Sequence, residues 1–277
     1  MVDTMNWVST PTLTAALEAF RSNSGSSGAL RLRSVPVGVV PPTPTDPSAG
    51  RGDGTSERSL IGAARVLGEP VGYIQEHGGG LVQNLIPARG LEQRQVSTSS
   101  DVQLEWHTET AFHPHKPRYL LLLCLRGDPE ARTLLCSVDD VLPHLDDETI
   151  AILRQPRFRT RPDESFLEPG TIGELGAPLA VLDGDEFTYD EDLMVGIDDD
   201  AQAALARLGV AVREHAQAIV LAAGDLLVID NHRVVHGRSA FHARFDGTDR
   251  WLLRKFVVES LDPSAAERDG RIITTRF

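Results

Sequence analysis

His107 and Glu109 are the residues of this chain whose types and spacing point most directly to chemistry. They form a His-x-Glu pair within the stretch Trp106-His107-Thr108-Glu109-Thr110. On an extended segment, residues i and i+2 point to the same face, so the imidazole and the carboxylate could bind one metal ion together. Such a triplet has little specificity by itself, and its interpretation as a metal site requires a third ligand from elsewhere in the chain.

His236 is the candidate for this third ligand, because it follows a predicted strand within Val234-Val235-His236-Gly237-Arg238. Two histidines and one carboxylate occupy one face of an octahedral metal and leave the other positions open. This arrangement suits non-haem Fe(II) oxygenases, in which iron must hold a co-substrate and O₂ at once. The same residue types also bind zinc with an open position, so a zinc hydrolase is an alternative.

Composition and charge restrict the class of protein. The 277 residues are 41% hydrophobic and 24% charged, which is ordinary for a globular protein. The formal net charge of -13 argues against a nucleic-acid partner, because phosphate binding needs clustered Lys and Arg. No apolar run approaches the ~20 residues that span a bilayer, so we expect a cytoplasmic protein with no membrane partner. Cys124 and Cys136 lie in apolar runs and are expected to be reduced core residues.

Buried strands are predicted around the candidate ligands. The continuous apolar run 118–125 is typical of a strand that is buried on both faces. Further strands are expected at 30–40, 81–86, 133–138, 224–231 and 250–258, and helices at 12–21, 59–67, 139–153 and 198–215. The segment 41–56 has four prolines, three glycines and no apolar periodicity, so we expect a flexible loop or a lid.

A longer pattern around His236 resembles a known family. The stretch Asn231-His232-Arg233-Val234-Val235-His236-Gly237-Arg238 is similar to the Asn-x-x-x-x-His-Gly-Arg signature of the iron(II)- and 2-oxoglutarate-dependent dioxygenases of the clavaminate synthase-like group, relatives of taurine dioxygenase. Arg250 follows His236 by fourteen residues, and Thr133 follows the first metal pair, as in that family. The resemblance covers about 68–258. It implies a mainly β fold with flanking helices, a double-stranded β-helix (jelly roll, cupin-like core), as a single domain over 1–277.

The resemblance also implies cofactors and their ligands. Fe(II) would be held by His107, Glu109 and His236, and Arg250 with Thr133 would bind the far carboxylate of 2-oxoglutarate. A planar guanidinium can hold a carboxylate through two parallel hydrogen bonds, which a lysine cannot do. Arg254 occupies a second arginine position, near the carboxylate of the co-substrate or the substrate. The implied reaction uses O₂, converts 2-oxoglutarate to succinate and CO₂, and hydroxylates an unactivated C–H bond.

The substrate implied by the resemblance is a small molecule. In the amino-acid hydroxylases of this group, residues at the positions of Gln83 and Ser97 hold the backbone of an α-amino acid, and Glu109 is placed to meet its amine. Relatives that bind a guanidinium carry carboxylates in the stretch Asp190-Glu191-Asp192, but this chain does not clearly reproduce their pattern, so an arginine substrate is not expected. We therefore expect a free or modified amino acid, or a derivative such as a cyclic dipeptide, in specialised or antibiotic biosynthesis.

Several alternatives remain open from the sequence. The same iron centre can run desaturation, ring closure or epoxidation, because the outcome depends on how the substrate is placed. A zinc hydrolase would not require the pair Thr133 and Arg250, and a non-catalytic jelly-roll binding protein would not require intact metal ligands. Nothing in the sequence indicates an oligomeric state.

Overall fold

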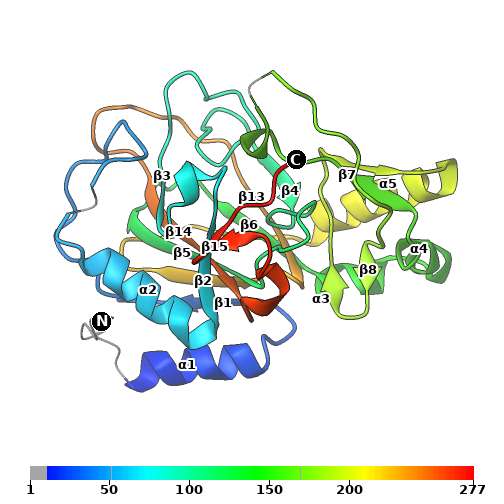
Figure 1. Cartoon of the computed structure of the whole chain (residues 1–277), viewed down its shortest axis with the longest axis horizontal. Coiled ribbons are helices and arrows are strands. Elements are labelled where there is room, and N and C mark those ends of the chain that lie inside the picture. The colour runs from blue at the N-terminus through cyan, green and yellow to red at the C-terminus, as the bar shows by residue number, and fades with distance from the viewer. Residues whose placement is uncertain (1–10, 51, 169) are drawn as a thin grey trace.

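The computed structural model describes residues 11–50, 52–168 and 170–277. Its architecture is mixed α/β, with several sheets flanked by helices (Figure 1). The α-helices are α1 (Pro11–Ser22), α2 (Thr55–Leu67), α3 (Val138–Val141), α4 (Asp147–Leu153) and α5 (Asp199–His215). Short 3₁₀ helices are η1 (His77–Gly79), η2 (Leu142–His144), η3 (Glu164–Phe166) and η4 (Asp262–Ser264).

The large sheet has eight strands in the order β1-β12-β5-β14-β2-β16-β15, with β3 paired to β14 beside this path. Its strands are β1 (Ala29–Leu32), β2 (Glu69–Tyr73), β3 (Gln83–Leu85), β5 (Tyr119–Arg126), β12 (Leu226–Asp230), β14 (Trp251–Val258), β15 (Arg268–Asp269) and β16 (Ile272–Ile273). The longest strands, β5 and β14, pair antiparallel at the centre of the sheet.

The small sheet has four strands in the order β11-β6-β13-β4. Its strands are β4 (Leu104–His107), β6 (Thr133–Ser137), β11 (Gln217–Ile219) and β13 (Val234–Arg238). Two further pairs stand apart from both sheets: β7 (Phe158–Thr160) with β10 (Met194–Gly196), and β8 (Leu182–Asp183) with β9 (Glu186–Phe187). The strands β4 and β13 of the small sheet carry the candidate histidines.

The strand β5 explains why the sequence reads as a continuous apolar run there. Successive side chains of a strand point to opposite faces. Leu121 and Leu123 belong to the cluster packed under α1 and α2, whereas Leu120 and Leu122 belong to the cluster between the two sheets. Both faces of β5 are therefore covered, and an apolar residue is needed at every position.

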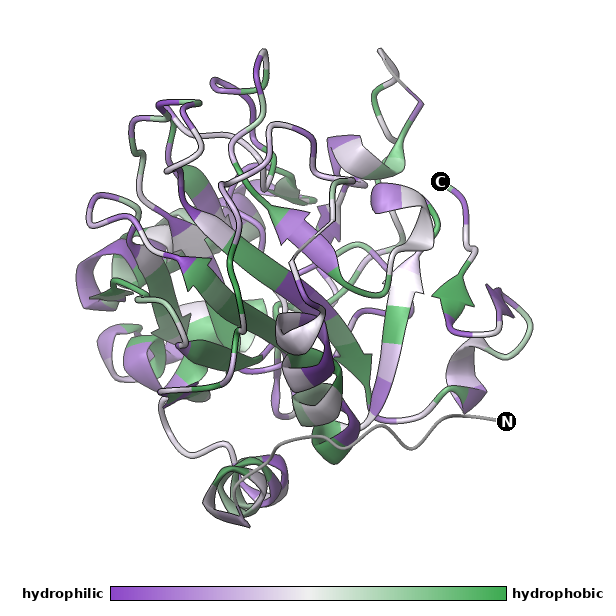
Figure 2. Ribbon diagram, turned by 90° about the vertical axis from the view of Figure 1, so that its left-hand side faces the viewer, coloured by the Kyte–Doolittle hydropathy of each residue, from purple (hydrophilic) through white to green (hydrophobic). Residues whose placement is uncertain are grey.

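Three apolar clusters hold the layers together. One packs α1 and α2 on the outer face of the large sheet, one lies between the sheets, and one packs α3, α4 and α5 on the small sheet. Figure 1 shows α1 and α2 on one side of the sheets and α4 and α5 on the other. Figure 2 shows the central strands coloured mostly as hydrophobic. The space between the sheets is thus the protected interior in which the candidate site lies.

Every strand and helix predicted from the sequence has a counterpart, but the strand predicted at 30–40 is wrong beyond residue 32. Ser34 has a left-handed φ of 59°, which breaks the extended path. Pro36 then follows without an N–H to donate to a neighbouring strand. The two cysteines are free and buried, as predicted.

The segment 41–56 is irregular up to the start of α2 at Thr55, and Arg51 lies outside the described residues. Hydrogen bonds connect this segment to the rest of the protein. Thr43 Oγ1 donates to the carbonyl of Asp249, and Asn84 Nδ2 donates to the carbonyls of Pro47 and Ala49. In the part of the chain that the structure describes, no helix is long and apolar enough to cross a membrane.

The packing under α1 and α2 gives a testable stability prediction. Val228 on β12 is 0% exposed, whereas Val39 in the loop is 72% exposed. We expect Val228→Ala to lower the free energy of unfolding by about 2 kcal/mol, because two buried methyl groups are lost and a cavity remains. The matched change Val39→Ala should alter it by less than about 0.5 kcal/mol. Urea unfolding monitored by circular dichroism measures both, and equal effects would contradict the layer assignment.

Candidate metal centre and substrate cavity

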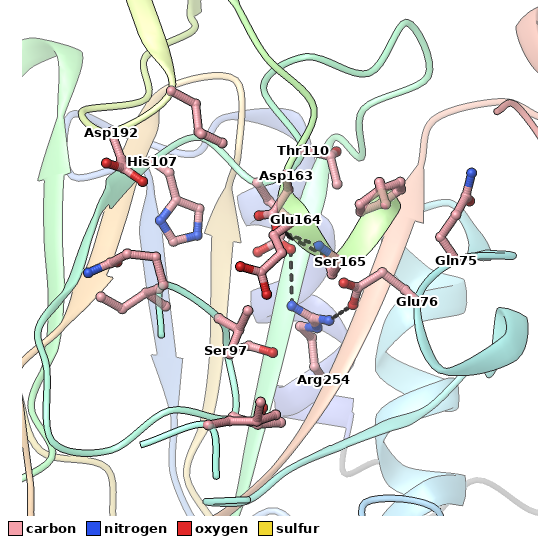
Figure 3. Close-up of a pocket in the computed structure, with 18 of the residues that line it drawn as sticks. Gln75, Glu76, Ser97, His107, Thr110, Asp163, Glu164, Ser165, Asp192 and Arg254 are labelled. Atoms are coloured by element: carbon pink, nitrogen blue, oxygen red, sulfur yellow. Dashed lines mark hydrogen bonds and ion pairs between the residues drawn. The ribbon is translucent and has the colours of Figure 1, made fainter. Parts of the chain in front are cut away.

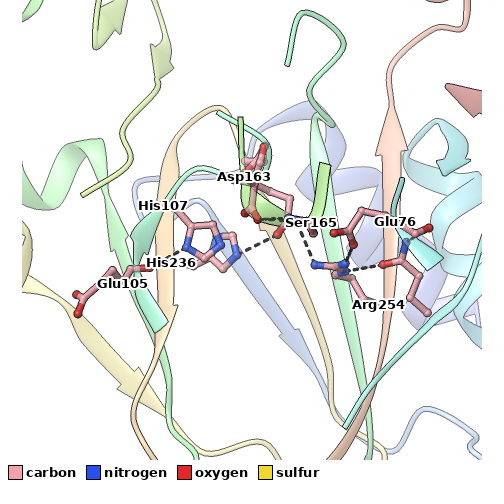
Figure 4. A network of polar contacts seen from close by, with 10 residues as sticks. Glu76, Glu105, His107, Asp163, Ser165, His236 and Arg254 are labelled. Atoms are coloured by element: carbon pink, nitrogen blue, oxygen red, sulfur yellow. Dashed lines mark hydrogen bonds and ion pairs between the residues drawn. The ribbon is translucent and has the colours of Figure 1, made fainter. Parts of the chain in front are cut away.

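His107 and His236 face each other across neighbouring strands of the small sheet. β13 and β4 run antiparallel, and their register places His236 directly opposite His107. The ring centroids are 4.3 Å apart. His107, His236 and Glu109 each offer one possible ligand atom, and these three atoms lie within 4.8 Å of one another. The structure therefore brings together the three residues that the sequence predicts as metal ligands. Figure 4 shows the two histidines side by side.

Asn231 holds Glu109 in place after the chain leaves β4. Its Oδ1 accepts from the backbone N–H of Glu109 at 2.7 Å, and its Nδ2 donates to the carbonyl of Glu109 at 3.1 Å and to that of Pro117 at 2.9 Å. Thr110 then has a left-handed φ of 52°, which is uncommon for a β-branched residue. The sequence analysis used Asn231 only as part of a motif. The structure shows that it fixes the backbone of the carboxylate.

The protonation states of Glu109 and His236 suit a divalent metal. Burial raises the pKa of Glu109, but the nearby Arg254 and His236 outweigh this effect and lower it to about 2. Burial and the neighbouring His107 lower the pKa of His236 to about 4. Metal ligands must be a carboxylate and neutral imidazoles. The Nδ1 of His107 lies 2.7 Å from the carbonyl of Glu105, which leaves its Nε2 available as a ligand.

A small inner cavity extends from the three ligands between the sheets. Leu120, Leu122 and Thr133 line it together with Arg250 and His236. Arg250 is 7% exposed, yet its guanidinium has no hydrogen bond or ion pair with any residue that the structure describes. The Oγ1 of Thr133 is also buried without a partner. An unpaired buried charge is unfavourable, so the inner cavity fits a bound carboxylate beside Arg250.

Arg254 differs from Arg250 because its charge is compensated within the protein. Its guanidinium forms ion pairs with Glu76 and, at 3.1 Å, with Glu109, and its Nε donates to Gln83 Oε1 at 2.8 Å. Burial lowers the pKa of Arg254, but the two carboxylates raise it above its ordinary value. Figure 4 shows this chain of contacts beside the histidines. The carboxylate of Glu109 therefore lies between the guanidinium of Arg254 and the imidazole of His236.

A larger outer cavity of about 500 Å³ opens from the same centre. Ser97, His107, Glu109 and Arg254 line both cavities. Figure 3 shows Ser97 and Arg254 on one side of the outer cavity, with Asp163 and Ser165 of the segment around η3 across from them. A small organic molecule in this cavity would lie against the metal ligands.

Arg238 fixes the loop that carries Ser97. The guanidinium of Arg238 is buried and donates to the carbonyl of Ser99 at 2.7 Å and to that of Val102 at 2.9 Å. Burial and the nearby Arg250 lower the pKa of Arg238 to about 9, so it remains charged at neutral pH. The arginine of the His-Gly-Arg motif thus links the strand of His236 to one wall of the outer cavity.

The residues predicted to bind substrate fall in different places. Ser97 lines both cavities. Gln83 lines neither cavity; it is 1% exposed and lies behind Arg254. Sequence reasoning missed Glu76 and Asp163, which line the outer cavity. The sequence contains only weak signals for these two residues. Glu76 comes just before a glycine-rich turn, and Asp163 is the N-cap of η3.

Asp163 and Asp190 are half-buried carboxylates of the outer cavity. Burial and the neighbouring Glu76 raise the pKa of Asp163 to about 6. Burial also raises the pKa of Asp190, which pairs through its backbone with His107. Each carboxylate accepts hydrogen bonds from nearby backbone N–H groups, Asp163 from Ser165 and Asp190 from Leu193. The wall of the cavity is therefore acidic beside the metal centre.

Comparison with protein families and curated proteins identifies relatives. Residues 51–255 match the family described as taurine catabolism dioxygenase TauD, TfdA family. The chain is 40% identical over 275 residues to the L-asparagine oxygenase of Streptomyces coelicolor, covering 95% of this chain and 81% of that protein. It is 36% identical over 292 residues to the enduracididine beta-hydroxylase of Streptomyces hygroscopicus, covering 94% and 84% respectively.

Solved structures show the same fold with ligands bound. Asparagine oxygenase in complex with Fe(II), 3-hydroxyasparagine and succinate superposes with a TM-score of 0.89 and 37% identity, covering 95% of this chain and 85% of that one. The non-haem iron oxygenase OrfP in complex with iron and α-ketoglutaric acid gives a TM-score of 0.84 and 32% identity, covering 95% and 86%. Both of these similar proteins hold iron, one with the keto acid and one with succinate.

Removal of one histidine tests the metal centre. We expect His107→Ala to abolish stoichiometric Fe(II) binding, because only His236 and Glu109 would remain as ligands. The control is His242→Ala, which removes an exposed histidine outside the centre. Anaerobic Fe(II) titration followed by metal analysis measures both variants. Full iron occupancy in His107→Ala would exclude this residue as a ligand.

Proposed function

Because the chain belongs to the taurine catabolism dioxygenase TauD, TfdA family and is an Fe(II)- and 2-oxoglutarate-dependent oxygenase, we propose that it hydroxylates an unactivated C–H bond of a free or modified amino acid in specialised metabolism. In this reaction the substrate C–H, 2-oxoglutarate and O₂ become C–OH, succinate and CO₂. One oxygen atom enters the hydroxyl group and the other enters succinate. The unpaired guanidinium of Arg250 beside the three clustered ligands is the observation that supports this proposal most directly.

His107, Glu109 and His236 hold the iron in this proposal. The bound metal supplies the redox chemistry that activates O₂, for which amino-acid side chains have no equivalent. The protein keeps the imidazole of His236 neutral and the carboxylate of Glu109 ionised at neutral pH. Asn231 keeps the backbone of Glu109 rigid, which fixes the positions left open for the co-substrate.

Arg250 and Thr133 bind the far carboxylate of 2-oxoglutarate. The hydroxyl of Thr133 and the guanidinium of Arg250 have no partner among the described residues, and both line the inner cavity with Leu120 and Leu122. A guanidinium and a hydroxyl around one carboxylate satisfy each of these groups at once. The opposite end of the keto acid then faces the metal ligands.

Arg254 and Glu76 supply opposite charges for the two ends of an α-amino acid backbone. The guanidinium suits an α-carboxylate, and the carboxylates of Glu76 and Glu109 suit an α-ammonium group. Ser97 faces the same cavity and can bond either group. Gln83 acts from behind by orienting Arg254. A cyclic dipeptide lacks both free charges, so this wall favours a free amino acid.

The finer description of the fold is also part of this proposal. We propose that the two facing sheets form a double-stranded β-helix and that the chain is a single domain. Contacts through the core between the sheets support this arrangement. We further propose that segment 41–56 acts as a lid, because Pro47 lines the outer cavity and residues 41–50 and 52–54 form no helix or strand.

Two features disfavour the alternative functions. A zinc hydrolase has no use for the unpaired Arg250 and Thr133, whereas a keto-acid co-substrate needs them. A non-catalytic binding protein has no use for three clustered metal ligands. Desaturation, ring closure and epoxidation use the same centre and differ only in the product.

The first test of the proposal is spectroscopic and then analytical. Anaerobic addition of Fe(II) and 2-oxoglutarate should produce a weak visible charge-transfer band. With O₂ and a panel of free amino acids, mass spectrometry should detect a product heavier by 16 mass units and an equal amount of succinate. A product lighter by 2 mass units would instead indicate desaturation or ring closure. Absence of the band in iron-loaded protein would contradict the proposal.

Arg250 has a separate test. We expect Arg250→Ala to raise the apparent KM for 2-oxoglutarate at least about tenfold, because a charged hydrogen-bonding partner of its carboxylate is lost. Iron binding should remain, since Arg250 is not among the clustered ligands. Arg33→Ala, at an exposed position, is the control. An unchanged KM would place the carboxylate elsewhere.

A further inference from the structure

A group of aromatic rings packs together beside the outer cavity. The centroids of neighbouring rings lie between 4.8 and 6.2 Å apart, and all of these pairs are tilted or edge to face. Such arrangements are favourable between aromatic side chains. We call this group the aromatic cluster, and its members are Tyr73, Phe112, His113, Phe166, Phe256 and Phe277. Of these six residues, only Phe166 lines the outer cavity.

His113 belongs to the aromatic cluster as a neutral ring. Its Nδ1 accepts a hydrogen bond from the backbone N–H of His115 at 2.9 Å. Burial and the neighbouring His115 lower the pKa of His113 to about 3. The imidazole is therefore uncharged at neutral pH and packs as an aromatic ring.

The aromatic cluster joins segments that carry groups of the outer cavity. Phe112 stands three residues after the metal ligand Glu109. Phe166 is the last residue of η3. Phe256 stands two residues after Arg254 on β14, and the guanidinium carbon of that arginine lies 4.7 Å from the centroid of the Phe256 ring. Packing of these rings therefore fixes the positions of three walls relative to one another.

The helix η3 is attached to the protein mainly through one side chain. Its backbone hydrogen bonds are local, from Phe166 N–H to the Asp163 carbonyl and from Leu167 N–H to the Glu164 carbonyl. Glu164 also forms an ion pair with Arg94, but both side chains are about half exposed, and such pairs contribute little. Phe166 is the buried residue of η3. Its aromatic contacts are therefore the main attachment of η3 beside the outer cavity.

Phe277 covers the aromatic cluster at the protein surface. The centroid of its ring lies 4.9 Å from that of Phe112 and 6.2 Å from that of Phe166, edge to face in both cases. The centroid of His113 is 5.2 Å away. Phe277 is 46% exposed, so about half of its surface is packed against these rings. One ring thus bridges the loop that follows the metal ligand Glu109 and the buried residue of η3.

The segment 274–277 is itself fixed beside the cavity. It follows β16, which runs parallel to β2. The carbonyl of Thr275 accepts a hydrogen bond from Gln75 Nε2 at 2.6 Å, and Gln75 lines the outer cavity. Figure 3 shows Gln75 and Ser165 of η3 on the same side of this cavity. The segment therefore holds Phe277 next to two parts of the cavity wall.

We propose that Phe277 is a positioning residue for substrate binding. Its ring holds Phe166, and with it η3, against the loop that follows Glu109, and so keeps the outer cavity in its binding shape. This inference rests on the proposed function for the kind of molecule that the cavity binds. No member of the aromatic cluster lines the inner cavity. Loss of the Phe277 ring therefore weakens binding of the amino acid and leaves binding of the keto acid unchanged.

Hydrogen exchange tests the position of η3 without any substrate. The full chain is loaded anaerobically with Fe(II) and 2-oxoglutarate, and amide exchange is followed by mass spectrometry. We expect Phe277→Ala to speed exchange of residues 164–167 at least about threefold, because edge-to-face contacts of the cluster are lost. Exchange in β4 and β13 and the charge-transfer band should not change. Phe277→Tyr keeps the ring and should behave as the unaltered protein.

Steady-state kinetics tests the consequence for substrate, with the amino acid that gives a product in the panel described above. Phe277→Ala should raise the apparent KM for this amino acid at least about threefold, while the KM for 2-oxoglutarate stays within about twofold. Val210→Ala is the control, because Val210 is also 46% exposed but lies on α5 and lines neither cavity. This variant should match the unaltered protein in both measurements.

The outcomes separate the inference from the proposed function. Unchanged exchange at 164–167, or an unchanged KM for the amino acid, would overturn the inference and leave the proposed function standing. An equal rise of both KM values, or faster exchange throughout the chain, would reveal a general loss of stability and would also overturn it. If no amino acid gives a product with the unaltered protein, the proposed substrate class fails, and hydrogen exchange alone decides whether Phe277 positions η3.

Discussion

The pairing of β4 with β13 is the interaction on which the rest of the site depends. These strands place His107 opposite His236, so two ligands from distant parts of the chain share one face. The third ligand follows two residues later and is held by Asn231, which lies between β12 and β13. Rigid strands and backbone hydrogen bonds therefore position all three ligands before a metal binds. Such preorganisation favours a defined coordination geometry.

Two buried arginines differ in whether the protein itself supplies a carboxylate partner for their charge. Arg250 immediately precedes β14, and Arg254 lies within this strand four residues later. Both side chains are buried. Arg254 has carboxylate partners within the protein, whereas Arg250 has none among the described residues. A buried cation without a partner is costly, so the position of Arg250 is best explained by a ligand that brings its own negative charge.

The two cavities divide the chemistry between them. The inner cavity presents free cationic and hydroxyl donors, and the outer cavity presents paired charges and several carboxylates. Both cavities reach Glu109 and His107, so molecules bound in the two cavities would lie against the same centre. Arg238 and Arg254 connect the walls of these cavities to the strands of the core. Changes in the loops can therefore alter the substrate without disturbing the metal centre.

The sequence by itself determined the residue types at the centre and the strands that carry them. Alternation and apolar runs predicted β5, β6, β12 and β14, and the spacing of His107, Glu109 and His236 pointed to one metal. Tertiary structure decided which polar groups meet. It pairs Glu76 with Arg254 and Asn231 with Glu109, and it places Asp163 and Asp190 in the lining of one cavity. These contacts join residues far apart in the chain through irregular segments, where no periodicity restricts the backbone. For this reason strand patterns were readable from the sequence, whereas the charges that face the substrate became visible only in the fold.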